Sequence, residues 1–203
     1  YDRTLREFDV PVLSIEDGFS EDDHEGWKRL SQQQGERLLI VGDDLVTTND
    51  ATIERAADLG LINAALIKAN QIGTLHETVL AMLVALGKGL DLVVSHRSKS
   101  PNDDMEAHIA LATNALGLKA GGGANTERLV KYHAVATQIA HVERGGSASP
   151  AIEHGASVSE LFASEEPTNA GIPTVGVEAE VTLDGGVRLA FRGATPLGTS
   201  AGT

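Results

Sequence analysis

The 203-residue sequence contains no cysteine, and aromatic residues make up only 3% of it. Without cysteine the chain has no disulfide scaffold, no zinc–thiolate site and no cysteine nucleophile. Basic residues are also scarce, 16 against 29 acidic ones, which gives a formal net charge of −13. Nucleic acids and anionic membranes bind basic surfaces, so we expect neither of them as a partner.

Long hydrophobic runs are absent as well. No stretch approaches the roughly 20 apolar residues of a membrane-spanning helix, and residues 1–20 lack the basic and then apolar pattern of a signal peptide. We therefore expect a soluble cytoplasmic protein. Hydrophobic residues still make up 41% of the chain, which is enough for a packed core. Since aromatics are few, aliphatic side chains must fill that core, as in the buried parallel sheets of α/β proteins.

Short apolar runs alternate with amphipathic stretches from residue 10 to residue 139. This alternation predicts parallel βαβ units. The expected strands cover residues 10–16, 37–42, 61–67, 90–95 and 117–119, and the expected helices cover residues 22–34, 48–59, 74–86, 103–116 and 125–139. Beyond them, period-two alternation at 175–183 and 187–192 flanks Asp184-Gly-Gly186, which predicts an antiparallel hairpin.

A charged or titratable residue lies at the end of each expected strand or directly after it, at intervals of 23 to 28 residues: Glu16, Asp43, Lys68, His96 and Lys119. A βα unit takes about 30 residues, so each unit places one such residue at its carboxyl end. In a parallel (β/α) barrel these ends form one rim, where active sites are built, whereas a doubly wound sheet would place them in a crevice. We favour the barrel because five consecutive strands share the feature.

The first three of these residues predict metal and base chemistry. Oxygen ligands from neighbouring strands, Glu16 and Asp43, suit Mg²⁺, although a solvated acidic loop is the alternative. Lys68 follows an apolar strand, where partial burial would lower its pKa and suit it as a general base. The alternative for Lys68 is a lysine that extends to the surface.

The last two strand ends predict anion binding. Arg97 and Ser98 follow a buried strand, and their donors suit a carboxylate or a phosphate. His96 beside them is either an acid–base group or a structural hydrogen-bonding residue. Lys119 precedes three glycines, which would let a ligand approach the backbone closely.

Five strings of residues carry a resemblance to a known family: Ser14–Asp17, Val41–Leu45, Lys68–Gly73, Ser95–Ser98 and Glu127–Tyr132. In this order and spacing they resemble the barrel of the enolases, the phosphopyruvate hydratases, over residues 8–142. The resemblance implies reversible dehydration of 2-phosphoglycerate to phosphoenolpyruvate through an ene-diolate stabilised by Mg²⁺, which is the chemistry of the enolase superfamily. It also implies a small phosphorylated hydroxy acid as the partner and a homodimer in the complete enzyme.

The resemblance assigns roles to the residues of the first three strands and to one residue of the tail. It implies that Glu16 and Asp43 bind the first Mg²⁺ and that Lys68 is the general base. Residues 171–186 and 196–202 resemble the beginning of the capping domain of this family, whose mobile loop holds a second Mg²⁺ through a serine. Ser200 would be that serine.

Roles also follow by resemblance for the last two strand ends. Lys119 would face the substrate carboxylate, Arg97 and Ser98 would bind the substrate phosphate, and His96 would lie beside the closing loop. We therefore count Lys68, Lys119 and His96 as candidate catalytic residues.

The expected fold is a partial TIM-type barrel of about five βα units followed by a short antiparallel piece of an α+β capping domain. We expect the barrel part at residues 1–142, a linker at 143–165, rich in Gly and Ser up to Pro150, and the capping part at 166–203. In the family the cap precedes the barrel. The reversed order fits a circular permutation, a tandem fusion or a fragment.

Other features separate this chain from the family pattern. A third metal carboxylate and the acidic residues used for dehydration have no counterpart here, and five strands do not close a barrel that needs eight. We therefore expect the isolated chain to be catalytically incompetent. Lys119-Ala-Gly-Gly-Gly123 and Thr168-Asn-Ala170 depart from the family motifs. These departures leave open a divergent lyase acting on another phosphate or phosphonate acid, or a non-catalytic fragment.

Overall fold

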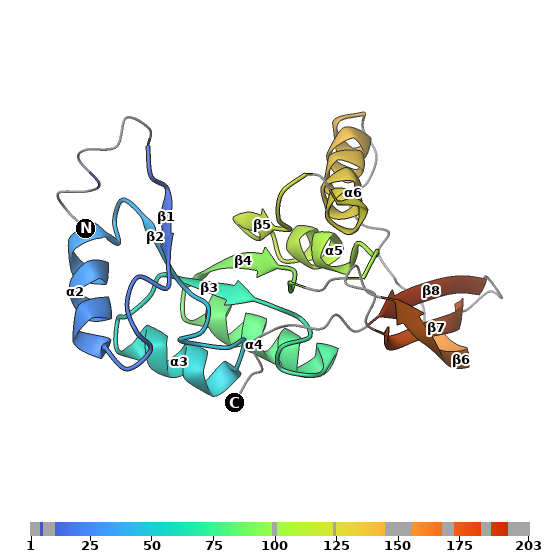
Figure 1. The fold of residues 1–203 in the computed structure, drawn as a ribbon, viewed down its shortest axis with the longest axis horizontal. Coiled ribbons are helices and arrows are strands. Elements are labelled where there is room, and N and C mark those ends of the chain that lie inside the picture. Colours follow the sequence, from blue (N-terminus) through green and yellow to red (C-terminus); the bar gives the residue numbers. More distant parts are fainter. Residues whose placement is uncertain are drawn as a thin grey trace. The chain divides into compact units, whose positions relative to one another are not determined.

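The computed structural model describes residues 5, 11–98, 101–123, 125–144, 156–167, 173–183 and 188–194, and Figure 1 shows their fold. These residues form two compact units. Unit 1 contains the described residues up to Ser95 together with Thr113–Leu118. Unit 2 contains His96–Ala112 and the described residues from Lys119 onward.

The larger sheet has five strands in sequential order, β1-β2-β3-β4-β5. They are β1 (Ser14–Glu16), β2 (Leu39–Gly42), β3 (Ala64–Ile67), β4 (Asp91–Ser95) and β5 (Gly117–Lys119). Neighbouring strands from β1 to β4 pair in parallel. Sequential parallel strands with a helix after each are the arrangement of part of a (β/α) barrel, so the predicted fold class is confirmed.

Five helices follow these strands. They are α2 (His24–Gln34), α3 (Asp50–Asp58), α4 (Leu75–Gly87), α5 (Met105–Ala112) and α6 (Thr126–Glu143). Asn49 caps α3 by accepting two backbone N–H bonds of its first turn. Thr74 caps α4 by accepting the Glu77 N–H at 3.1 Å, and its hydroxyl donates to the Glu77 carboxylate at 2.7 Å. Helix α5 ends earlier than expected, because Asn114 has the left-handed φ of +50° that stops a helix.

The core of unit 1 is built around β3, whose four residues are all completely buried. Burial on both faces explains why this strand is continuously apolar. Trp27 of α2 is also fully buried, and its indole N–H donates to the carbonyl of Ser20. On one side of the sheet α3 and α4 run next to each other (Figure 1), where the Lys88 ammonium pairs with Glu54 and Asp58 at 3.0 and 2.8 Å.

Unit 2 contains a second sheet of three antiparallel strands in the order β6-β7-β8. The strands are β6 (Ala156–Pro167), β7 (Pro173–Leu183) and β8 (Arg188–Ala194). Pairing of β7 with β8 confirms the expected antiparallel piece, whereas its turn at 184–186 lies outside the described residues.

Strand β6 lies largely within residues 143–165, which were expected to form a linker. The Gly/Ser-rich composition ends at Pro150, and β6 carries Val158, Leu161 and Phe162, which favour extended backbone. Its pairing with β7 continues through a bulge between Val158 and Glu160. The division of the chain into domains remains a prediction.

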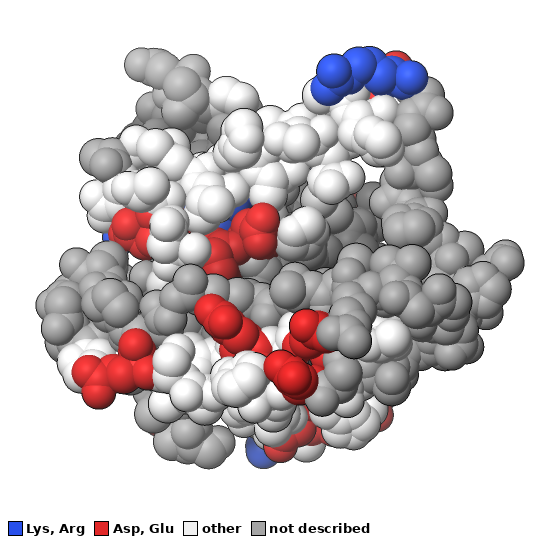
Figure 2. Space-filling model, turned by 90° about the vertical axis from the view of Figure 1, so that its right-hand side faces the viewer, with Lys and Arg blue, Asp and Glu red and all other residues white. Residues whose placement is uncertain are grey.

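Acidic side chains outnumber basic ones on the face drawn in Figure 2. On this face, Asp and Glu occur in several separate groups, while Lys and Arg gather mainly in one place. Among the described helices, none is both long enough and apolar enough to cross a membrane.

Candidate functional site

Asp43 and Lys68 form a buried ion pair in unit 1. Each residue directly follows a strand, Asp43 after β2 and Lys68 after β3, and these two strands pair in parallel. The Lys68 Nζ lies 2.6 and 2.7 Å from the two carboxylate oxygens of Asp43. Both side chains are only about a tenth exposed. The carboxyl ends of adjacent strands therefore bring together two residues that are 25 positions apart in the sequence.

A buried threonine fixes the backbone of Lys68. The Lys68 N–H donates to the Thr48 hydroxyl oxygen at 3.0 Å, and that hydroxyl donates to Gln71 Oε1 at 3.1 Å. Gln71 closes the turn by donating its own N–H to the Lys68 carbonyl. Thr47 and Thr48 both have the left-handed φ that a β-branched residue rarely adopts, +48° and +57°. Strain of this kind persists where surrounding contacts hold the backbone in place.

A second carboxylate, Asp17, organises the turn after β2. Its two oxygens accept the backbone N–H groups of Asp43 and Asp44, each at 2.9 Å. Oxygen atoms of Asp17, Asp43 and Asp44 all lie within 4.8 Å of one another, close enough to bind a single metal ion. Glu16, the expected ligand at the end of β1, is exposed and is not a member of this acidic group.

His96 and Lys119 lie together in unit 2. The backbone N–H and the Nδ1 atom of His96 both contact the carbonyl oxygen of Lys119, at 3.0 and 2.8 Å. A carbonyl can only accept, so Nδ1 carries a proton and donates it. Burial lowers the pKa of His96 below its ordinary 6.5; the hydrogen bond to the Lys119 carbonyl opposes this shift, and the cations Arg128, Lys131 and Lys119 add to it. The imidazole is therefore neutral near pH 7, with its lone pair on Nε2.

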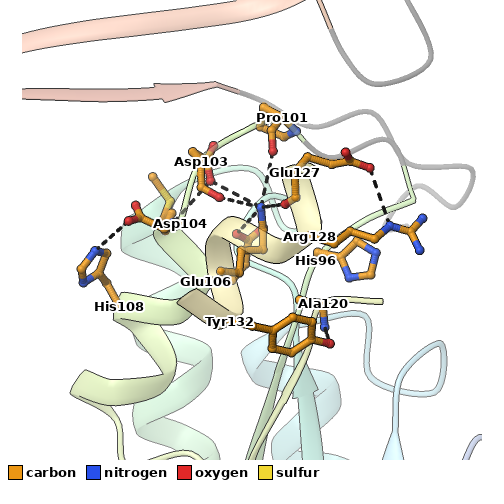
Figure 3. Close-up of polar contacts among 12 residues, drawn as sticks. His96, Pro101, Asp103, Asp104, Glu106, His108, Ala120, Glu127, Arg128 and Tyr132 are labelled. Atoms are coloured by element: carbon orange, nitrogen blue, oxygen red, sulfur yellow. Dashed lines mark hydrogen bonds and ion pairs between the residues drawn. The ribbon is translucent and has the colours of Figure 1, made fainter. Parts of the chain in front are cut away.

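Two expected anion-binding residues follow His96 directly. Arg97 is half-buried and Ser98 is exposed. We call His96–Ser98 the anion segment. Figure 3 shows His96 of this segment, together with polar contacts among residues of α5, of α6 and of the chain before α5 and after β5.

Tyr132 of α6 holds the segment that follows Lys119. Its hydroxyl oxygen accepts the Ala120 N–H at 3.2 Å, and the hydroxyl donates to the Gly121 carbonyl at 2.9 Å. Gly121 has a φ of +83°, and a Cβ there would lie 2.6 Å from the Arg128 guanidinium. The positive φ favours glycine at this position, and a larger residue would also force the flexible Arg128 side chain to move.

The remaining predicted ligand, Ser200, lies outside the described residues. Within unit 1 the structure brings Asp43 and Lys68 together, and within unit 2 it brings His96 to Lys119.

Comparison with known proteins shows the family. Residues 1–158 match the family model described as enolase, C-terminal TIM barrel domain. The chain belongs to the enolase family.

A curated relative of the same family is the enolase of Anaplasma phagocytophilum (strain HZ). It is 44% identical over 133 residues, which cover 66% of this chain and 30% of that protein. The aligned part of this enolase-family chain therefore corresponds to less than a third of the relative's length.

Several residues that position their neighbours, each within its own unit, were not expected from the sequence. Thr48, Gln71, Asp17, Lys131 and Tyr132 hold their neighbours in place through contacts with residues distant along the chain. All five lie within or beside the strings that carry the family resemblance, so a signal existed. Their roles depend on the fold and could not be assigned from residue type alone.

Proposed function

We propose that this chain carries the proton-abstracting and anion-binding parts of an enolase-type lyase, which interconverts 2-phosphoglycerate and phosphoenolpyruvate. The observation that carries this proposal is the buried pair of Asp43 and Lys68 at the ends of adjacent parallel strands. Family membership supports the reaction class. The side chains of the other predicted site residues are of the chemical types that this reaction needs.

Lys68 is the proposed general base. Nζ is an ammonium in the ion pair with Asp43, so it must release a proton before it acts. As the amine it takes the proton from the substrate carbon next to the carboxylate, and the electron pair of the broken C–H bond moves into that carboxylate as an ene-diolate. The contacts of Thr48 with Lys68 and Gln71 limit the freedom of the base. Such positioning matters because a reacting group held in place avoids the entropy cost of finding its orientation.

The carboxylates around Lys68 fit Mg²⁺ in chemical type. The group of Asp17, Asp43 and Asp44 offers only oxygen atoms, the ligands that Mg²⁺ prefers. We propose that Asp43 holds the ion, together with Glu16 from the adjacent strand as the family resemblance implies. When bound, Mg²⁺ supplies positive charge that stabilises the ene-diolate.

The residues of unit 2 are proposed to bind the substrate anions. Arg97 offers a planar fork of donors for a phosphate, and Ser98 adds a hydroxyl. The ammonium of Lys119 suits the substrate carboxylate. Since neutral His96 carries its lone pair on Nε2, it can accept a hydrogen bond or a proton and is not an acid near pH 7.

Exchange of the substrate C2 hydrogen in D₂O tests the proposal. Proton NMR follows 2-phosphoglycerate mixed with the purified chain and Mg²⁺. We expect exchange without accumulation of phosphoenolpyruvate, because the dehydration acid has no counterpart in this chain. Lys68→Ala should slow the exchange about 10²–10⁴-fold, as expected for the loss of a general base.

The matched control is Lys88→Ala, which removes an exposed lysine that is paired with Glu54 and Asp58. It should exchange like the wild-type chain. Equal exchange rates in Lys68→Ala and the wild type, or no exchange in the wild type, would contradict the assignment of the base. Rapid formation of phosphoenolpyruvate would instead contradict the expected incompetence of the isolated chain.

A further inference from the structure

Lys131 of α6 is completely buried, although lysine is among the residues least often found inside proteins. Its ammonium donates to three backbone carbonyls, those of Pro101, Asp103 and Glu127, at 3.4, 2.7 and 2.9 Å. An ammonium has three donors, so this set of carbonyls satisfies all of them. Figure 3 shows the three carbonyl-bearing residues directed towards a common centre.

Two carboxylates balance the charge of this buried cation. Glu106 Oε2 lies 3.5 Å from Lys131 Nζ, and Asp103 Oδ1 lies at 3.9 Å. Burial raises the pKa of Glu106, and the Lys131 ammonium opposes that rise. Burying an ion is costly unless it is both paired and hydrogen-bonded. The Lys131 cluster, which we define as Lys131 with Pro101, Asp103, Glu106 and Glu127, meets both conditions.

The anion segment lies between two anchors. At its start, the backbone and ring of His96 donate to the Lys119 carbonyl. Beyond its end, the carbonyl of Pro101 is held by Lys131, only three residues after Ser98. Three residues span at most about 10 Å, so the second anchor restricts where Ser98 can lie.

Helix α6 carries the second anchor and also steadies the first. Lys131 holds the chain beyond the anion segment, and the next residue, Tyr132, holds the chain that follows Lys119. Two adjacent residues of α6 thus fix two segments, the chain beyond Ser98 and the chain after Lys119. The hydrogen bonds from His96 to the Lys119 carbonyl connect these two segments. This arrangement goes beyond what helix packing requires, because an apolar side chain at position 131 would pack without any buried charge.

We infer that Lys131 is a positioning residue for the substrate's anionic group. By fixing the Pro101 and Asp103 carbonyls, it holds Arg97 and Ser98 where their donors can converge on one phosphate. The inference rests on the proposed function for the identity of that anion. Lys131 itself makes no contact with the anion, so its effect is measured as phosphate affinity.

The test compares the binding of inorganic phosphate by the full 203-residue chain and three variants, followed by ³¹P NMR titration. Lys131→Met keeps an unbranched side chain, shorter by one heavy atom, and removes the charge and the donors. The double variant Lys131→Met/Glu106→Gln also removes the carboxylate that would be left buried without its cation. Lys88→Met is the control, since Lys88 is an exposed lysine of unit 1.

We expect both Lys131 variants to bind phosphate about tenfold more weakly than the wild type, on the scale of one charge-assisted hydrogen bond. Thermal unfolding should separate positioning from stability. The double variant should recover most of the melting temperature lost in Lys131→Met. Its phosphate affinity should stay low, because the Pro101 and Asp103 carbonyls still lack the Lys131 donor. Recovery of both properties together would overturn the inference and leave Lys131 a purely structural residue.

A second measurement uses the wild-type chain alone, so its outcome does not depend on whether a variant folds. The ¹⁵N resonance of the Lys131 ammonium should shift when phosphate is added, although this group is inaccessible to solvent. An unchanged resonance while phosphate binds would overturn the inference, and so would a wild-type chain that binds no phosphate. A changed affinity or resonance in the presence of phosphate tests Lys131 alone, whereas the C2 exchange assay tests the proposed base separately through Lys68 of unit 1.

Discussion

Replacing Asp43 by asparagine tests whether the buried ion pair supports the fold of unit 1. The substitution keeps the size of the side chain and one oxygen acceptor, and it removes the negative charge beside Lys68. Both charged side chains are about a tenth exposed, with Nζ–Oδ distances of 2.6 and 2.7 Å. In the variant the Lys68 ammonium stays buried without an opposite charge in contact.

The expected loss follows from that burial. Removing one partner of a buried ion pair costs about 3–5 kcal/mol, and the retained oxygen of asparagine places the expected value near 3 kcal/mol. The free energy of unfolding falls by roughly 1–3 kcal/mol for each molar of urea, so this loss should lower the urea concentration at the unfolding midpoint by about 1–3 M. The double variant Asp43→Asn/Lys68→Met leaves no buried charge, so it should return to within about 1 kcal/mol of the wild type.

Fluorescence of Trp27 supplies the assay. It is the only tryptophan in the chain and is fully buried in unit 1, so its emission reports the unfolding of that unit. Titrations in urea with EDTA keep divalent metals away from Asp43. Lys88→Met, which breaks an exposed pair, should leave the midpoint unchanged. The reasoning is refuted if Asp43→Asn unfolds at the wild-type midpoint, or if the double variant is no more stable than the single one.

Three further predictions concern the supporting contacts. The pKa of His96 is lowered in the folded chain, so the unfolded chain binds a proton on this residue more readily. The contribution of His96 to stability is therefore complete above about pH 6.5 and is lost as the pH drops towards the lowered pKa. His96→Asn should flatten this pH dependence when unfolding is followed by circular dichroism. Tyr132→Phe should cost about 0.5–1.5 kcal/mol and speed hydrogen exchange at the Ala120 amide, and an unchanged exchange rate there would refute the role of the hydroxyl. Thr48→Val should cost about 1–3 kcal/mol, because the buried N–H of Lys68 loses its acceptor; a urea midpoint equal to that of the wild type would be evidence against this contact.

Much of the fold could be predicted because its signals are local. Asn49 and Thr74 mark the starts of α3 and α4, and continuous apolar runs mark the buried strands. Parallel pairing then brings consecutive strand ends to one edge, which is why the approach of Asp43 to Lys68 follows from their positions. Strand β6 was not predicted, since its residues became strand through pairing with β7.

The side-chain details of the site could not be predicted in the same way. A lysine on a helix that carries both apolar and charged residues extends to solvent in most proteins, and only the carbonyls of Pro101 and Asp103 make Lys131 different. Likewise, Glu16 and Asp17 are neighbours in the sequence, but the left-handed φ of Asp17 turns its carboxylate towards the amides after β2. Both outcomes depend on contacts across the fold.

The lengths of the strands bear on the behaviour of the purified chain in solution. The outer strands of the described sheet, β1 and β5, have three residues each, while β2, β3 and β4 between them have four or five. An outer strand exposes N–H and C=O groups on which another molecule can add a strand, and natural proteins limit this risk with short edges and charged residues. Both outer strands end on a charged side chain, Glu16 or Lys119. The short length of these strands thus limits how many backbone groups each edge of the sheet offers to an added strand.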